Sequence, residues 1–193
     1  AELGREMSLR MPLVDFFSLK SNLSNNIIDA SPMLWELRII KSNAEIAKIK
    51  HICEITREAY ENLPLIIKEG DTERDISRKL RIDLISRGVD SIPFLPIVSG
   101  EGGVSQIICE PTNRRLKNGD ILFIDTGSTY DGYFCDFDRN YSIGKVSDIV
   151  NDVYEILWIA TQSAIDVAKP GITLSDLWQI MVEKLDKYLP KNY

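Results

Sequence analysis

One short pattern occurs twice in this sequence and constrains its fold more than any other feature. Gly70–Ile76 and Gly171–Leu177 both read Gly-x-Thr-x-x-Asp followed by Ile or Leu. Each lies between two segments with helical spacing of apolar residues, as expected when a glycine ends one helix and a threonine caps the next. The apolar register also matches, because Ala59 aligns with Ala160. The repeat predicts an α+β fold with internal pseudo-symmetry, although two unrelated helix pairs with the same capping chemistry would look alike.

Strand and turn signals lie between the two helix pairs. Asp131-Gly132 is a hairpin-type turn between the apolar run Ile121–Asp125 and the partner strand Tyr133–Ile143. Upstream, Ile92–Val98 is strand material broken by two prolines and followed by a glycine-rich turn. The helices are expected at Ser42 to Gly70, Thr72 to Gly88, Ser147–Ala168 and Thr173–Leu189. This order of elements predicts a second hairpin beyond residue 193.

Two aspartates on the hairpin are the candidate functional residues. Asp125 ends an apolar run, where a buried carboxylate must be paired, coordinated or neutralised, and Asp136 returns on the partner strand. Two neighbouring carboxylates repel each other, and a divalent cation would remove that penalty because hard cations take oxygen ligands. The alternative is structural: Asp125 caps a turn, and Asp136 pairs with Arg139 or Arg114. Residue spacing alone does not choose between them.

Composition excludes several classes of protein. With 44% hydrophobic residues the chain can bury a core, and its net charge of −6 disfavours nucleic acid or an anionic membrane as partner. No apolar run approaches the roughly 20 residues that span a bilayer. The three cysteines match no disulfide framework or zinc motif, which favours a reducing, cytoplasmic setting. The single histidine, His51, is expected at the surface or in packing, whereas Trp158 and Trp178 lie on helical stripes and are expected in the core.

The hairpin and its flanks carry a longer motif. It consists of Gly119-Asp120, Asp125-Thr126-Gly127, Gly132-Tyr133, Asp136, Arg139 and Gly144. This order of residues resembles the pattern of the metallopeptidases that include methionine aminopeptidase, Xaa-Pro aminopeptidase and prolidase. The segment Leu37–Ile46 and the signature Gly70-x-Thr72-Glu73 also resemble that family, so the similarity covers about Trp35 to Leu189.

The resemblance implies the pita-bread (creatinase/aminopeptidase) fold. Residues 35–193 would form the first pseudo-symmetric half of the catalytic domain, and residues 1–34 the remnant of an N-terminal domain. Residues 1–6, which precede Met7, are expected to be a cloning scar.

The resemblance further implies a metal-dependent hydrolase of the Xaa-Pro peptidase type, in which two divalent ions (Mn, Co, Zn or Fe) activate a water. In that family's arrangement, Asp125 would be the bidentate ligand of one ion and Asp136 would bridge the two. A His and two Glu, one of them the general base, would complete the site from beyond residue 193, so this chain alone would be inactive. A peptide or small-molecule substrate and a homodimer are expected by analogy with relatives.

Two positions depart from the family pattern. Ile108 (or Cys109, if the register shifts by one) stands where a substrate-binding His is usual, and its structural interpretation is a buried strand residue. Asp138 stands where Thr is common, on the same strand face as the second aspartate, so it is an extra ligand, a support for a ligand, or a solvated partner of Arg139. Thr126 and Arg139 are themselves candidates for supporting the ligands. Substrate-binding residues are otherwise unknown.

The missing His leaves two other functions open. One is a non-peptidase member of the fold, a creatinase-like hydrolase or lyase that acts on a small metabolite, although creatinase lacks the metal that the two aspartates favour. The other is a catalytically inactive binding module, which the retained aspartates disfavour.

Overall fold

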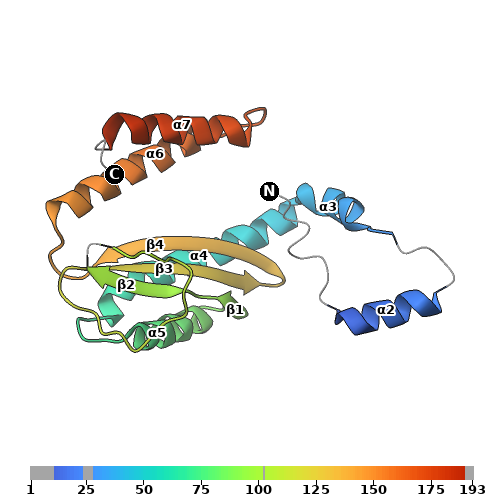
Figure 1. The fold of residues 1–193 in the computed structure, drawn as a ribbon, viewed down its shortest axis with the longest axis horizontal. Coiled ribbons are helices and arrows are strands. Elements are labelled where there is room, and N and C mark those ends of the chain that lie inside the picture. Colours follow the sequence, from blue (N-terminus) through green and yellow to red (C-terminus); the bar gives the residue numbers. More distant parts are fainter. Residues whose placement is uncertain (1–10, 24–27, 102, 190–193) are drawn as a thin grey trace. The chain divides into compact units, whose positions relative to one another are not determined.

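The computed structural model describes residues 11–23, 28–101 and 103–189. Its elements in chain order are α2 (Leu13–Asn22), α3 (Ser31–Ile39), α4 (Asn43–Ile66), α5 (Glu73–Ser86), β1 (Ser91–Phe94), β2 (Ile97–Glu101), β3 (Asp120–Tyr130), β4 (Tyr133–Ser142), α6 (Asp148–Val167) and α7 (Leu174–Tyr188) (Figure 1). None of the helices in these residues is long and apolar enough to cross a membrane.

Contacts divide the chain into two units, Ala1–Ala47 and Lys48–Tyr193. The first unit contains α2 and α3, neither of which has a buried residue. The helix α4 begins in the first unit, and most of its length belongs to the second. A domain boundary between residues 34 and 35 stays a prediction.

The two copies of the repeated motif adopt the same local structure. Thr72 forms a capping box with Asp75 at the start of α5, and Thr173 forms one with Asp176 at the start of α7. In each box the threonine hydroxyl accepts a backbone N–H of the first turn and the aspartate accepts the N–H of the threonine. The glycines that precede the two boxes have φ values of +88° and +98°, in the left-handed region where glycine carries no steric penalty. The helix starts were thus predictable from the sequence.

The strand β3 is the central strand of a four-stranded antiparallel sheet whose strands differ in length. It pairs with β4 along one edge, and with β1 and then β2 along the other. Pro96 separates β1 from β2, and β2 runs to Glu101, into the stretch expected to be a glycine-rich turn. The predicted turn is confirmed: Asp131 and Gly132 have φ values of +46° and +81°, as a two-residue hairpin turn of type I′ requires.

The strand β3 continues to Tyr130, well past Asp125, where the strand was expected to end. Its second half is held on both edges, since β1 and β4 both pair with it. Asp125 therefore lies in the middle of the central strand rather than beside a turn.

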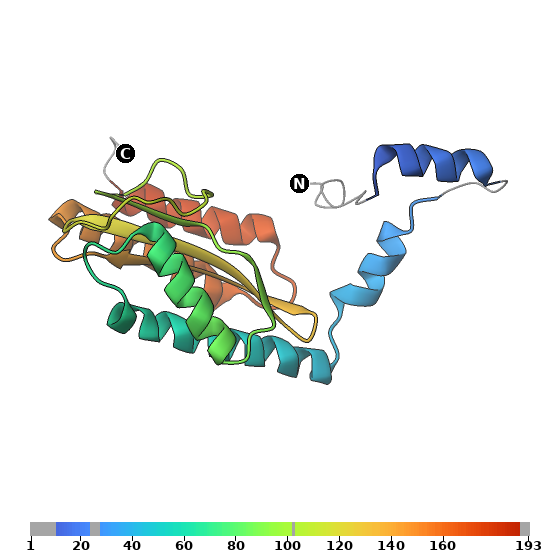
Figure 2. The ribbon, with the colours of Figure 1, turned by 90° about the horizontal axis from the view of Figure 1, so that it is seen from below.

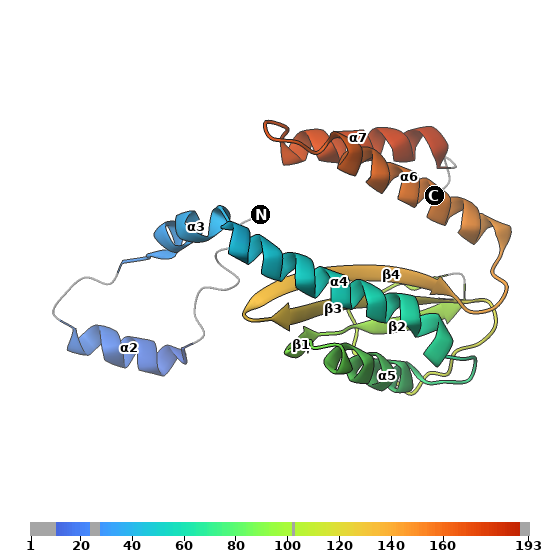
Figure 3. The same cartoon turned by 180° about the vertical axis from the view of Figure 1, so that it is seen from behind.

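The core lies between the sheet and the helices α4 and α5, which cover one of its faces (Figure 3). Figure 2 shows the same two helices from below. The core side chains without exposed surface include Ile52, Leu63, Ile76, Leu80, Leu84, Ile97, Leu122 and Ile124. Side chains alternate along a strand, so β3 buries Leu122 and Ile124 against the helices and points Asp125 to the other face of the sheet.

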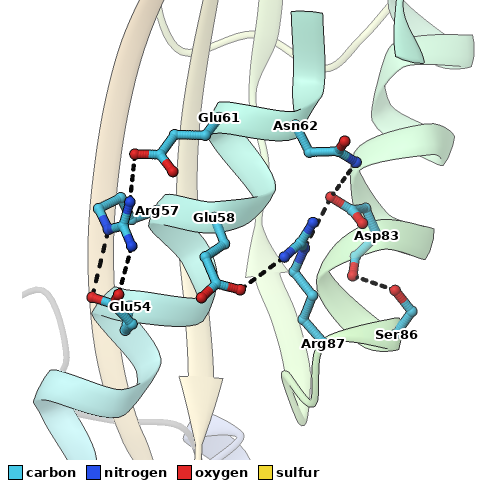
Figure 4. Close-up of polar contacts among 8 residues, drawn as sticks. All are labelled: Glu54, Arg57, Glu58, Glu61, Asn62, Asp83, Ser86 and Arg87. Atoms are coloured by element: carbon cyan, nitrogen blue, oxygen red, sulfur yellow. Dashed lines mark hydrogen bonds and ion pairs between the residues drawn. The ribbon is translucent and has the colours of Figure 1, made fainter. Parts of the chain in front are cut away.

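Polar contacts at the surface tie α5 to α4 (Figure 4). Arg87, just after α5, donates to Glu58 of α4 at 2.8 Å and to Asp83 at 3.2 Å. Asn62 of α4 donates to the same Asp83 carboxylate at 3.2 Å. Such partly exposed pairs contribute little stability individually, so the apolar core is what holds the two helices on the sheet.

The burial of the single histidine agrees with expectation, and the burial of two tryptophans does not. His51 is exposed, with its ring edge-on to Tyr130 at a centroid distance of 4.6 Å, as a packing histidine was expected to be. Trp158 and Trp178 were expected in the core, and this was wrong: they are 57% and 65% exposed. The helices α6 and α7 pack against each other (Figure 1), and both rings stay more than half exposed.

Candidate metal centre

The β3–β4 hairpin brings three carboxylates onto one face of the sheet. Asp125 of β3 stands directly opposite Asp138 of β4, and Asp136 stands opposite Gly127, one step further along the same face. Side chains opposite each other in an antiparallel pair share a face, and residues two apart on a strand do so too. The predicted convergence of Asp125 and Asp136 is therefore present, and Asp138 joins them.

The three carboxylates repel one another. Desolvation raises the pKa of Asp125 above its ordinary value, and the charges of Asp136 and Asp138 raise it further. Desolvation also raises the pKa of Asp138, with an opposing effect from Arg139 and a reinforcing one from Asp136. In the part of the chain that the structure describes, no lysine or arginine forms an ion pair with any of the three. The negative charge of the cluster is thus offset only in part, by Arg139, and, within the described residues, not by an ion pair.

Two fully buried carboxylates provide a comparison with the cluster, in which Asp125 is half-buried and the two aspartates of β4 are exposed. Glu73, 2% exposed, accepts four hydrogen bonds from the backbone and hydroxyls of Ser99 and Thr112, at 2.6 to 2.9 Å. Asp120, 1% exposed, accepts both ends of the Arg114 guanidinium at 2.6 and 2.7 Å, which lowers its pKa. These two buried carboxylates are satisfied by N–H and O–H donors, whereas the half-buried Asp125 has another carboxyl, that of Asp136, as its hydrogen-bond partner.

The positions and contacts of these residues contradict the structural alternative for the two aspartates. Asp125 does not cap a turn, because it lies within β3. Arg114 is occupied by Asp120 and Ser99 and is not a partner of Asp136. Arg139 donates to the backbone carbonyl of Asp138 at 2.7 Å rather than to a carboxylate.

Thr126 and Arg139, expected to support the ligands, do not face them. Both belong to the opposite face of the hairpin, since they alternate with Asp125 and Asp138. Thr126 is fully buried with its hydroxyl 2.6 Å from that of Tyr60, and Arg139 lies over the Phe137 ring at 5.0 Å. Their side chains therefore lie on the face away from the carboxylates, and their role in supporting the ligands stays a prediction.

Tyr60 of α4 is a residue near the site that the sequence analysis missed. It is 4% exposed, and burial raises the pKa of its hydroxyl above the usual range, an effect that the Thr126 hydrogen bond opposes and the charges of Asp125 and Asp138 increase. The signal in the sequence was slight: a tyrosine beside the apolar stripe of α4, where its hydroxyl would need a buried partner.

Ile108 is neither on a strand nor buried. It lies in the loop between β2 and β3 and is 69% exposed, so the expectation of a buried strand residue was wrong. Glu73 anchors the loop at Thr112, and Leu116 further along the loop joins the core, whereas Ile108 stays outside it. The position can accept a substitution without cost to packing.

The donor set fits a hard divalent cation. Carboxylate oxygens are the ligands that such ions prefer, and a cation between Asp125 and Asp136 would offset the repulsion that raises the pKa of Asp125. Within residues 11–23, 28–101 and 103–189, no three His, Cys, Asp or Glu side chains are arranged to hold a metal ion by themselves. The roles of Asp125 and Asp136 as ligands stay predictions.

The raised pKa of Asp125 predicts an unusual effect of mutation. A carboxyl whose pKa is higher in the folded chain stabilises the fold at low pH, and this contribution is lost as pH rises from about 4 through the raised pKa. We therefore expect Asp125→Asn, in EDTA at pH 7, to melt at a higher temperature than the wild type. The gap should close near pH 3, where both side chains are neutral. Circular dichroism melts test this, and an equal or lower melting temperature at pH 7 would contradict it.

Comparison with known proteins gives the family. The model of metallopeptidase family M24 matches residues 47–193. The chain is similar to the Xaa-Pro dipeptidase of Pyrococcus furiosus, with 30% identity over 186 residues, which are 96% of this chain and 53% of that protein. Among solved structures, it is similar to the prolidase from Pyrococcus furiosus (TM-score 0.84, 27% identity, 95% of this chain and 55% of that one). It is also similar to the X-Pro aminopeptidase from Thermotoga maritima (TM-score 0.79, 28% identity, 92% and 51%).

The chain spans about half the length of the relatives it matches. The matched residues 47–193 contain the helix pair α4 and α5, the sheet and the carboxylate hairpin. The chain belongs to metallopeptidase family M24, and it carries the first half of that family's pita-bread fold.

Proposed function

We propose that this chain is the front half of a metal-dependent hydrolase of the Xaa-Pro peptidase type, with Asp125 and Asp136 as two of its metal ligands. The observation that supports this most directly is the carboxylate cluster on the β3–β4 hairpin, in a chain of a metallopeptidase family. The similar proteins named as Xaa-Pro dipeptidase and prolidase support a peptide substrate.

In this proposal, the role of this chain's own residues is to hold two carboxylates at a fixed spacing. Asp125 and Asp136 lie on paired strands, so the backbone ladder sets their spacing before any ion arrives. When bound, divalent ions would supply Lewis acidity that polarises a scissile carbonyl and makes water a better nucleophile. Asp138, directly opposite Asp125, adds negative charge to the same face and increases the attraction for a cation. The groups that transfer protons are proposed to come from the remainder of the protein.

A second candidate function is that of a hydrolase or lyase that acts on a small metabolite, and one observation favours it. Ile108 presents an exposed aliphatic side chain where relatives usually have a hydrogen-bond donor to the substrate. A site built around a donor binds its peptide less well once the donor is lost, by about tenfold for one hydrogen bond.

A substrate panel separates the two candidates. We expect a protein of the relatives' length that carries this chain to hydrolyse Xaa-Pro dipeptides once it is loaded with Mn²⁺ or Co²⁺, and to lose that activity in EDTA. Small methylated amines and sulfonium compounds form the other arm of the panel. Turnover of these compounds without any peptide cleavage would replace the peptidase assignment, and failure of both arms with metal bound would favour the binding module.

A further inference from the structure

The hydroxyl of Tyr60 links both strands of the carboxylate hairpin from the side opposite the carboxylates. It lies 2.6 Å from the Thr126 hydroxyl on β3 and 3.1 Å from the backbone carbonyl oxygen of Phe137 on β4. A third contact, 3.4 Å long, reaches the carbonyl oxygen of Ile124. One arrangement of protons satisfies the two shorter contacts: Thr126 donates to Tyr60, and Tyr60 donates to Phe137.

The contacts of Tyr60 fall on the immediate neighbours of the carboxylate residues. Ile124 and Thr126 flank Asp125 in the sequence. Phe137 lies between the other two aspartates of the cluster and is the cross-strand partner of Thr126. A single side chain of α4 therefore holds the backbone at the point where the two strands carry their charges.

The hairpin needs such a tie because its charges act to separate the strands. Like charges directly opposite each other on paired strands are destabilising, and Asp125 and Asp138 are such a pair. The bond between the Tyr60 and Thr126 hydroxyls is buried, and the bond to Phe137 is partly buried, so both are electrostatically stronger than in water. Tyr60 belongs to the core face of α4, so the rigidity of the core is transmitted to the strands.

From this geometry we propose that Tyr60 is a positioning residue for the metal ligands, an inference that rests on the proposed function. The hydroxyl of Tyr60 fixes the separation of Asp125 and Asp136, and without it the fold survives while the two carboxylates lose their preset spacing. Groups that orient metal ligands without touching the metal are typically worth about 10- to 100-fold in affinity.

Tyr60→Phe tests this, with Tyr141→Phe as the matched control. Tyr141 also has a partly buried hydroxyl, which donates to the backbone carbonyl of Tyr60 at 2.9 Å rather than to a group on β3 or β4. Each change removes one hydroxyl, so we expect the two variants to lose similar amounts of stability. Affinity for Mn²⁺ should fall roughly tenfold in Tyr60→Phe and stay within about twofold of the wild type in Tyr141→Phe.

The readout is paramagnetic broadening of amide NMR signals during a Mn²⁺ titration of the 193-residue chain, which also detects weak binding and reports the fold of each variant. Thr126→Val removes the partner of Tyr60 on β3, so the double variant Tyr60→Phe/Thr126→Val should lose little more affinity than either single variant. Equal affinity in Tyr60→Phe and the wild type would overturn the positioning role alone. Absence of Mn²⁺ binding by the wild type would overturn the metal site and this inference with it.

Discussion

In a Mn²⁺ titration of this chain, we expect Asp125→Asn and Asp136→Asn each to weaken binding by at least about tenfold, because even groups that only support ligands have effects of that size. Both changes keep the size of the side chain and remove one negative charge from the cluster on the hairpin. Asp138→Asn should weaken binding less than these two changes. Asp138 is proposed to attract the ion by its charge, whereas the other two aspartates are proposed to coordinate it. In the wild type, the paramagnetic broadening of NMR signals by Mn²⁺ should be strongest for the amides of β3 and β4.

Asp131→Asn is the control for this titration. Asp131 lies in the turn of the same hairpin, is exposed, and pairs with Lys48 at the surface. Its φ of +46° is one that asparagine also adopts readily, so the turn should be preserved. If Asp131→Asn reduces binding as much as Asp125→Asn, the ion responds to the general charge of the hairpin, and the proposed centre is wrong.

The features of this site and fold that depend on a few neighbouring residues could be predicted from the sequence. Strand alternation and the turn at Asp131-Gly132 were enough to put Asp125 and Asp138 on one face, because each depends on backbone geometry over a few residues. Capping chemistry located the starts of α5 and α7 for the same reason.

Contacts between distant segments could not be predicted in this way. The bond of Tyr60 to Thr126 joins a helix to a strand, and no periodicity within either segment indicates it. The length of β3 depended on β1 and β4, whose pairing with its second half is a tertiary effect. The exposure of Ile108 likewise follows from where its loop is anchored, and not from its apolar character.

Glu73 is the strongest example of a long-range contact, and its removal should have the largest effect on stability. We expect Glu73→Ala to lower the free energy of unfolding by roughly 3–5 kcal/mol, because each buried donor left without a partner costs about 1–3 kcal/mol. The lost acceptor serves the N–H and hydroxyl of Ser99 on β2, at 2.8 and 2.7 Å, and those of Thr112 in the loop, at 2.9 and 2.6 Å. A loss of this size is a large share of the roughly 5–15 kcal/mol that stabilise a typical domain.

Urea denaturation followed by circular dichroism measures this effect, with Glu58→Ala as the control. Glu58 also accepts from another side chain, that of Arg87, but it is 45% exposed, so its removal should cost less than about 1 kcal/mol (Figure 4). Glu73→Gln should fall between the two, since the amide keeps one acceptor oxygen and turns the other toward donors as an NH₂ group. Similar urea midpoints for Glu73→Ala and Glu58→Ala would mean that the loop between β2 and β3 contributes little to the fold. In that case the contrast between a satisfied Glu73 and an Asp125 whose hydrogen-bond partner is another carboxyl would lose its force as an argument for a metal centre.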